Sequence, residues 1–180
     1  MNIHFTQRIA AAVLALAVAA LAGCASGALK ENMAAAPVAA TKKLPYAVRV
    51  DARGGAETGA LDSSNVSNAD LKAAIEASIA QSSLFKTVVQ GKDGDYELTV
   101  TVAELTKPLI GLSFTVTMEA GWSLVKVSDR SVAMRKAIRS THTAGFSDSM
   151  VGVTRLRMAV EGAVRNNISQ GLQAISELPI

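Results

Sequence analysis

The sequence is poor in the residues that most often carry chemistry. Its 180 residues include one cysteine, two histidines and only 4% aromatic residues. Because Cys24 has no second cysteine to pair with, the chain forms no internal disulfide. A serine–histidine–aspartate triad would have to use His142, the only histidine after Cys24, and a zinc site needs three or four ligands. We therefore expect no catalytic residues, no metal site and no cofactor.

Recognised catalytic and nucleotide-binding motifs are also missing after Cys24. The chain has no G-x-S-x-G nucleophile motif there, and Gly54, Gly55 and Gly59 belong to no phosphate-binding pattern. Lysine and arginine total 18 against 15 acidic residues, with no run of five basic residues. A nucleic-acid-binding surface is not indicated.

The N-terminus has the three parts of a signal peptide. Residues 1–8 are mostly polar and contain Arg8, and Ile9–Ala22 is an uninterrupted apolar run of 14 residues. A membrane-spanning helix needs about 20 apolar residues, so this run is too short for a permanent anchor. We predict that residues 1–23 are cleaved.

The residues at the predicted cleavage site, Leu21-Ala22-Gly23-Cys24, resemble the bacterial lipobox. This resemblance implies that Cys24 receives a diacylglyceryl group and, after cleavage, an acyl chain such as palmitate on its amine. The alternative is an ordinary secretory signal with a chance cysteine. Ala25, in place of the aspartate that retains lipoproteins in the inner membrane of enteric bacteria, favours the periplasmic side of the outer membrane.

The remaining chain divides into a tether and one domain. Residues 24–43 are alanine-rich, contain Pro37 and lack an apolar stripe, so we predict a lipidated cysteine followed by a flexible tether. Residues 44–180 are long enough for one domain with its own core.

Hydrophobic periodicity predicts strands and helices in the order β-α-β-β-β-α. The expected strands are 46–51, 95–105, 113–124 and 132–141, and the expected helices begin at 67 and near 153. One-sided strands favour an α+β two-layer sandwich of about four mostly antiparallel strands, with two helices on one face. In the last helix, Arg155, Glu161 and Asn167 are predicted outside the buried stripe.

The other face of the predicted sheet is polar and open to solvent. It would carry Thr99, Thr101, Thr115, Thr117, Glu119, Arg135 and Arg139. Arg135 and Arg139 are candidate ligands for acidic groups such as lipid phosphates. The alternative is an ordinary solvated surface.

Large apolar residues stand at the expected turn between the second and third strands. Leu109, Ile110 and Leu112 lie in Pro108–Leu112, although turn tips are normally polar. We hypothesise that they contact a protein partner or a lipid tail. The alternative is that this loop folds over the end of the core.

Four segments resemble a broad set of small periplasmic lipoproteins. They are Ser83–Val88, Asp95–Val100, Trp122–Leu124 and Ala163–Ile168. The set includes YajG-like lipoproteins, auxiliary lipoproteins of ABC-type envelope transporters and, more distantly, LptE. Ser128–Ser131 stands where members often have a Thr-Gly-Lys turn. The resemblance implies a non-enzymatic role in envelope assembly or transport through a protein partner. A lipid- or glycan-binding module is the alternative.

Overall fold

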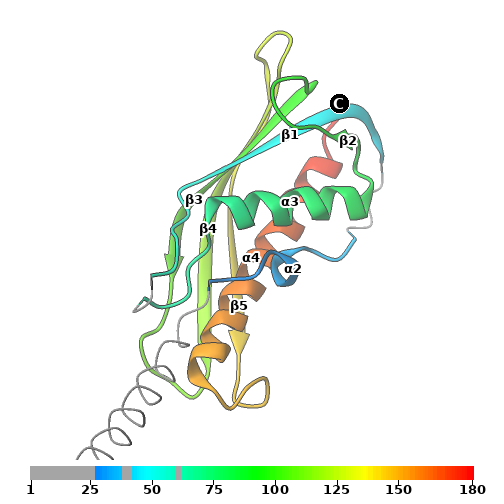
Figure 1. The fold of residues 1–180 in the computed structure, drawn as a ribbon. Coiled ribbons are helices and arrows are strands. Elements are labelled where there is room, and N and C mark those ends of the chain that lie inside the picture. The colour runs from blue at the N-terminus through cyan, green and yellow to red at the C-terminus, as the bar shows by residue number, and fades with distance from the viewer. Residues whose placement is uncertain (1–26, 38–41, 60–61) are drawn as a thin grey trace, which may run out of the picture.

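A mixed sheet with helices on one side forms the domain (Figure 1). The computed structural model describes residues 27–37, 42–59 and 62–180. Within these residues, the elements in chain order are α2 (Lys30–Met33), β1 (Leu44–Arg53), α3 (Asn68–Ser82), β2 (Phe85–Val88), β3 (Tyr96–Thr106), β4 (Phe114–Lys126), β5 (Val132–Ala144) and α4 (Gly152–Ser176).

The five strands are ordered β2-β1-β3-β4-β5. Strand β1 runs parallel to both of its neighbours, and β3, β4 and β5 form the predicted antiparallel meander. Helix α3 contacts β1 and β2, and α4 contacts β4 and β5. Both helices cover the same face of the sheet (Figure 1). The predicted α+β class, with helices on one face, is confirmed.

The strand count and the pairing differ from the prediction. Strand β2 is a fifth strand that the sequence pattern does not reveal, because it has four residues and only Phe85 is buried. Such a short segment offers no alternation. Its parallel pairing with β1, together with that of β1 and β3, makes the sheet mixed rather than mostly antiparallel.

Helix α3 begins where the sequence indicates. The hydroxyl of Ser67 accepts a hydrogen bond from the backbone N–H of Asp70 at 3.0 Å, which satisfies one of the free donors of the first turn. Leu71, Ile75 and Ile79 are buried beneath the helix. Ser83 ends it in the left-handed conformation, with φ of 50°.

A buried polar network joins α4 to the sheet. Trp122 of β4 donates through Nε1 to Oδ1 of Asn167 at 2.9 Å, and the Asn167 amide donates to the carbonyl of Ile138 and to Oγ of Ser140. Asn167 is fully buried, contrary to the prediction that it lies outside the stripe. Its partners explain the burial, because a buried amide is tolerated when it is fully hydrogen-bonded.

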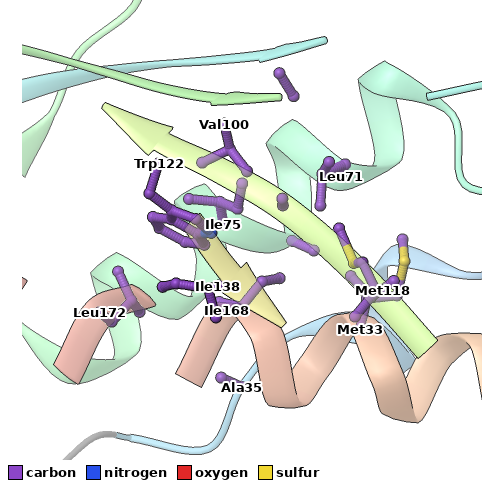
Figure 2. Close-up of a cluster of buried hydrophobic side chains, with 14 of the residues drawn as sticks. Met33, Ala35, Leu71, Ile75, Val100, Met118, Trp122, Ile138, Ile168 and Leu172 are labelled. Atoms are coloured by element: carbon purple, nitrogen blue, oxygen red, sulfur yellow. The ribbon is translucent and has the colours of Figure 1, made fainter. Parts of the chain in front are cut away.

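The Trp122 ring also lies very close to helix α4. A Cβ atom at Gly171 would lie 2.5 Å from the indole ring, so only glycine lets the ring approach there. Trp122 is surrounded in the core by residues from all layers, including Ile75, Val100 and Leu172 (Figure 2).

Part of the predicted tether is folded into the domain. Ala28, Met33 and Ala35 are 3%, 0% and 1% exposed and belong to the same core cluster as Met118 (Figure 2). The backbone N–H of Ala35 donates to Oγ of Ser78 at 2.9 Å. The flexible-tether prediction is therefore wrong for residues 28–35, which form part of the helical layer.

Candidate functional site

The connection between β3 and β4 exposes its apolar residues almost completely. Leu109, Ile110 and Leu112 are 95%, 92% and 80% exposed. The alternative that this loop folds over the end of the core does not hold. Three large apolar side chains exposed on one loop are unusual for a protein surface and indicate that the loop contacts another molecule.

A second apolar connection lies at the same end of the sheet. Phe114 at the start of β4 pairs with Ala144 at the end of β5, so the β3–β4 and β5–α4 connections are neighbours, as Figure 1 shows. The exposed apolar residues of the second connection and the first turn of α4 are Phe146, Met150, Val151 and Val153. Together with Leu109, Ile110 and Leu112, we name them the apolar pole.

Arg155 holds the second connection in place from inside. Its guanidinium lies 5.5 Å from the ring centroids of both Phe114 and Phe146, and its Nη1 donates to the carbonyl of Ser149 at 2.7 Å. Arg155 is buried, which corrects the prediction that it lies outside the stripe. Hydrophobic periodicity does not predict this half of the pole, although the apolar pair Met150-Val151 outside any periodic element is a signal of it.

The N-terminal segment 28–35 is fastened to α4 by a buried carboxylate. Glu161 is 3% exposed, and its two oxygens accept from the backbone N–H of Leu29 and from Nδ2 of Asn32, each at 3.0 Å. Arg165 adds a hydrogen bond to the carbonyl of Asn32 at 2.8 Å. We call these contacts the N-terminal latch. Glu161 was predicted outside the buried stripe; its burial follows from these donors.

The start of the N-terminal segment 28–35 lies close to the apolar pole. The backbone N–H of Ala28 donates to the carbonyl of Asn65 at 3.0 Å, and Lys107, at the start of the β3–β4 connection, donates through Nζ to the side chain of Asn65 and the carbonyl of Ser64. Partial burial lowers the pKa of Lys107, and the Asp62 carboxylate partly opposes this shift. The chain thus enters the domain beside the first apolar loop.

The outer face of the sheet is polar, and none of the helices in the described residues lies over it (Figure 1). All seven residues predicted for it lie on this face, since they alternate with buried positions or pair with one another across strands. Arg139 pairs in register with Glu119, and Arg135 with Ser123. Neither arginine has an acidic atom within 4.0 Å among the described residues, and both are exposed.

The other end of this face carries an ion-pair cluster. Arg49 bonds to Glu97 at 2.7 Å, and Arg130 reaches the same carboxylate at 3.3 Å. The hydrogen bond from Arg49 holds the pKa of Glu97 below its ordinary value, and burial opposes this effect. The pairing neutralises these arginines, whereas Arg135 and Arg139 keep their charges available.

Strand β5 forms one edge of the sheet, and helix α4 partly covers that edge. The side-chain amides of Asn166 and Asn167 donate to the carbonyls of Thr141 and Ile138, each within 2.9 Å. Lys136, also exposed on β5, adds a charge. Capped carbonyls and a lysine are features that discourage unwanted strand pairing at an edge.

His142 lies on the helix-facing side of β5, opposite Val116. Its ring packs against Gly162, where a Cβ atom would collide with it. Within the described part of the chain, no group of three His, Cys, Asp or Glu side chains could hold a metal ion. Cys24, the predicted lipid attachment site, lies outside the described residues. Among those residues, no helix has the length and apolar character to span a membrane.

Comparison with known proteins shows the fold and no sequence family. No protein-family model matches the sequence, and no curated protein sequence matches it. A Xanthomonas campestris protein of the family DUF330 superposes with a TM-score of 0.61 at 16% identity, covering 78% of this chain and 89% of that one. A hypothetical Chlamydia trachomatis protein, CT253, gives 0.54 at 5% identity, covering 72% and 95%.

A lipoprotein is also among the solved structures that superpose in part on this chain. A minor lipoprotein from Acinetobacter baumannii has a TM-score of 0.47 at 10% identity, covering 77% of this chain and 97% of that one. The fold is thus shared with other bacterial proteins of low sequence identity.

Proposed function

We propose that this protein is a bacterial lipoprotein, anchored through Cys24 to the periplasmic side of the outer membrane, that binds a protein partner in envelope assembly or transport without catalysing a reaction. The lipobox-like Leu21–Cys24 supports the anchor. The polar sheet face supports the partner, and it is the observation on which the proposal depends.

The polar face has the properties of a protein-binding platform. It extends over strands of 11 to 13 residues, and the hydrogen bonds of Asn167 join helix α4 to the opposite side of these strands. Its exposed arginines suit charge-assisted hydrogen bonds to carboxylates. Arginine is also enriched at protein interfaces, so Arg135 and Arg139 are the side chains we expect to contact the partner.

The alternative, a lipid- or glycan-binding module, has less support. A ligand between helices and sheet would need an internal space, and that layer is filled by buried side chains such as Trp122, Met118 and Leu172 (Figure 2).

The test is cross-linking in intact cells from a photoreactive residue placed at Arg139. We expect a reproducible protein adduct there, and none from the matched position Gln170, which is exposed on α4. The double variant Arg135→Ser/Arg139→Ser should weaken partner binding about tenfold or more, since hydrogen bonds to charged groups contribute roughly 1.5–3 kcal/mol each. Equal adducts from both positions, or full binding by the double variant, would contradict the proposal.

A further inference from the structure

We infer that the apolar pole docks into the lipid bilayer that carries the chain's own anchor, so that the domain stands in one fixed orientation. The inference rests on the lipidation of Cys24 made in the proposed function, and it assigns the apolar loops to lipid rather than to the protein partner.

The start of the N-terminal segment limits how far the domain can lie from the membrane. Ala28 is bound to the domain through Asn65, and Cys24 lies only four positions before it in the sequence. An extended chain spans at most about 3.6 Å per residue, so the anchor lies within roughly 14 Å of Ala28. A flexible tether of 20 residues would have left the orientation free.

The pole lies on the side of the domain where the chain leaves for the membrane. Lys107 and Ala28 share Asn65 as a hydrogen-bond partner, which places the β3–β4 connection beside the entry of the chain. The β5–α4 connection is at the same end of the sheet, and the β4–β5 turn and the C-terminus are at the other end (Figure 1). A short anchor therefore brings both apolar loops to the bilayer surface.

The chemistry of the two loops suits lipid. Residues 108–113 contain no charged side chain, and residues 145–151 contain only Asp148, whose Oδ2 accepts from the backbone N–H of Gly145 at 2.7 Å. Arg155 points inward to Phe114 and Phe146 instead of carrying its charge to the tip. Projecting loops with apolar tips can enter the boundary between head groups and acyl chains, where apolar contact strengthens an anchor.

The test uses the full-length lipoprotein reconstituted in vesicles of phosphatidylethanolamine and phosphatidylglycerol. Because Cys24 is the only natural cysteine, the variants Ile110→Cys, Met150→Cys and Ser128→Cys each provide one thiol for an environment-sensitive fluorophore once Cys24 is lipidated. Ser128 is exposed in the β4–β5 turn and serves as the control. The mass of the N-terminal peptide reports lipidation separately.

We expect acyl-chain bromine to quench the fluorophore strongly at positions 110 and 150 and to leave it unchanged at 128. Lack of quenching at 110 and 150 in a protein whose Cys24 is lipidated would overturn the docking and leave the lipoprotein assignment intact. Quenching at 110 and 150 in a protein whose Cys24 is not lipidated would support the docking and contradict the lipid anchor. A protein cross-linked at 110 in cells, without quenching by lipid, would assign the pole to a partner and overturn the inference.

Discussion

The domain has two uncovered regions, the apolar pole and the polar sheet face, and they differ in how well water suits them. The pole exposes leucine, isoleucine, methionine and phenylalanine side chains, up to 95% exposed at Leu109. The polar face exposes threonines and charges, with the hydroxyls of Thr115 and Thr143 in contact at 2.8 Å. Water stabilises the second surface and not the first.

The difference teaches that exposure has to be judged by its chemistry. A solvated threonine face is stable without a partner and can bind and release one. Apolar side chains exposed to water raise the free energy of the protein, and covering them lowers it. Both regions depend on the same support, the contacts of α4 with the sheet and with the N-terminal segment.

The largest effect is expected from removing that common support. Asn167→Leu leaves the indole N–H of Trp122 without its acceptor, and an unsatisfied buried donor costs about 1–3 kcal/mol. The melting temperature should fall by roughly 2–4 °C for each kcal/mol. Asn166→Leu is the matched control, because its bond to Thr141 is at the exposed edge. Equal melting temperatures for both variants would contradict the role of the network.

The next effect is local and concerns the latch. Glu161→Ala removes the acceptor of Leu29 N–H and Asn32 Nδ2, so opening of residues 28–35 should become easier by about 1.4 kcal/mol, or roughly tenfold in exchange rate. Hydrogen–deuterium exchange measures this. Glu31→Ala, at an exposed position in the same segment, is the control. Unchanged protection of Leu29 would show that Glu161 does not hold the segment.

A smaller effect, which depends on pH, is expected on the free energy of unfolding from the ion pair of the polar face. The hydrogen bond from Arg49 lowers the folded-state pKa of Glu97 from its ordinary 4.5. The pair therefore stabilises the fold above that pH, and this contribution is lost as the pH falls through the lowered pKa. We expect such a pair to contribute less than about 1 kcal/mol to the free energy of unfolding. In urea unfolding, Arg49→Met should lose most of this pH dependence, since only the weaker effect of Arg130 on Glu97 remains, whereas Arg53→Met, in an exposed pair, should retain it.

The smallest effect on stability is expected at the pole itself. Leu109→Ser/Ile110→Ser removes side chains that make little contact with the core, so the free energy of unfolding should change by less than about 0.5 kcal/mol per residue. Thermal unfolding of the domain measures this. A large drop in the melting temperature would mean that these side chains support the fold, and the contrast between pole and core would fail.

The sequence predicts the long elements well, because alternation in β3, β4 and β5 and the four-residue spacing in α3 are strong signals. It predicts the polar open face, which depends on residue type on one side of each strand. It indicates that the apolar loop Pro108–Leu112 is unusual but does not decide whether the loop is exposed or folds over the core. The sequence does not predict the short strand β2, because its pairing with β1 defines it and no internal pattern does.

Buried polar residues are the main failure of the sequence reading. Arg155, Glu161 and Asn167 look like solvent-facing positions of a helix, yet each is buried by partners distant in the sequence. Hydrophobicity alone cannot reveal such partners. The same limit made residues 28–35 look like a tether, because Met33 and Ala35 pack without a periodic stripe.

The most direct test of the contrast between pole and face places the same photoreactive residue at Ile110 or at Arg139 of the full-length protein in cells. Mass analysis of the adducts then identifies what each position touches. We predict lipid adducts at position 110 and a protein adduct at position 139. The same protein adduct at both positions, with no lipid at 110, would contradict the account.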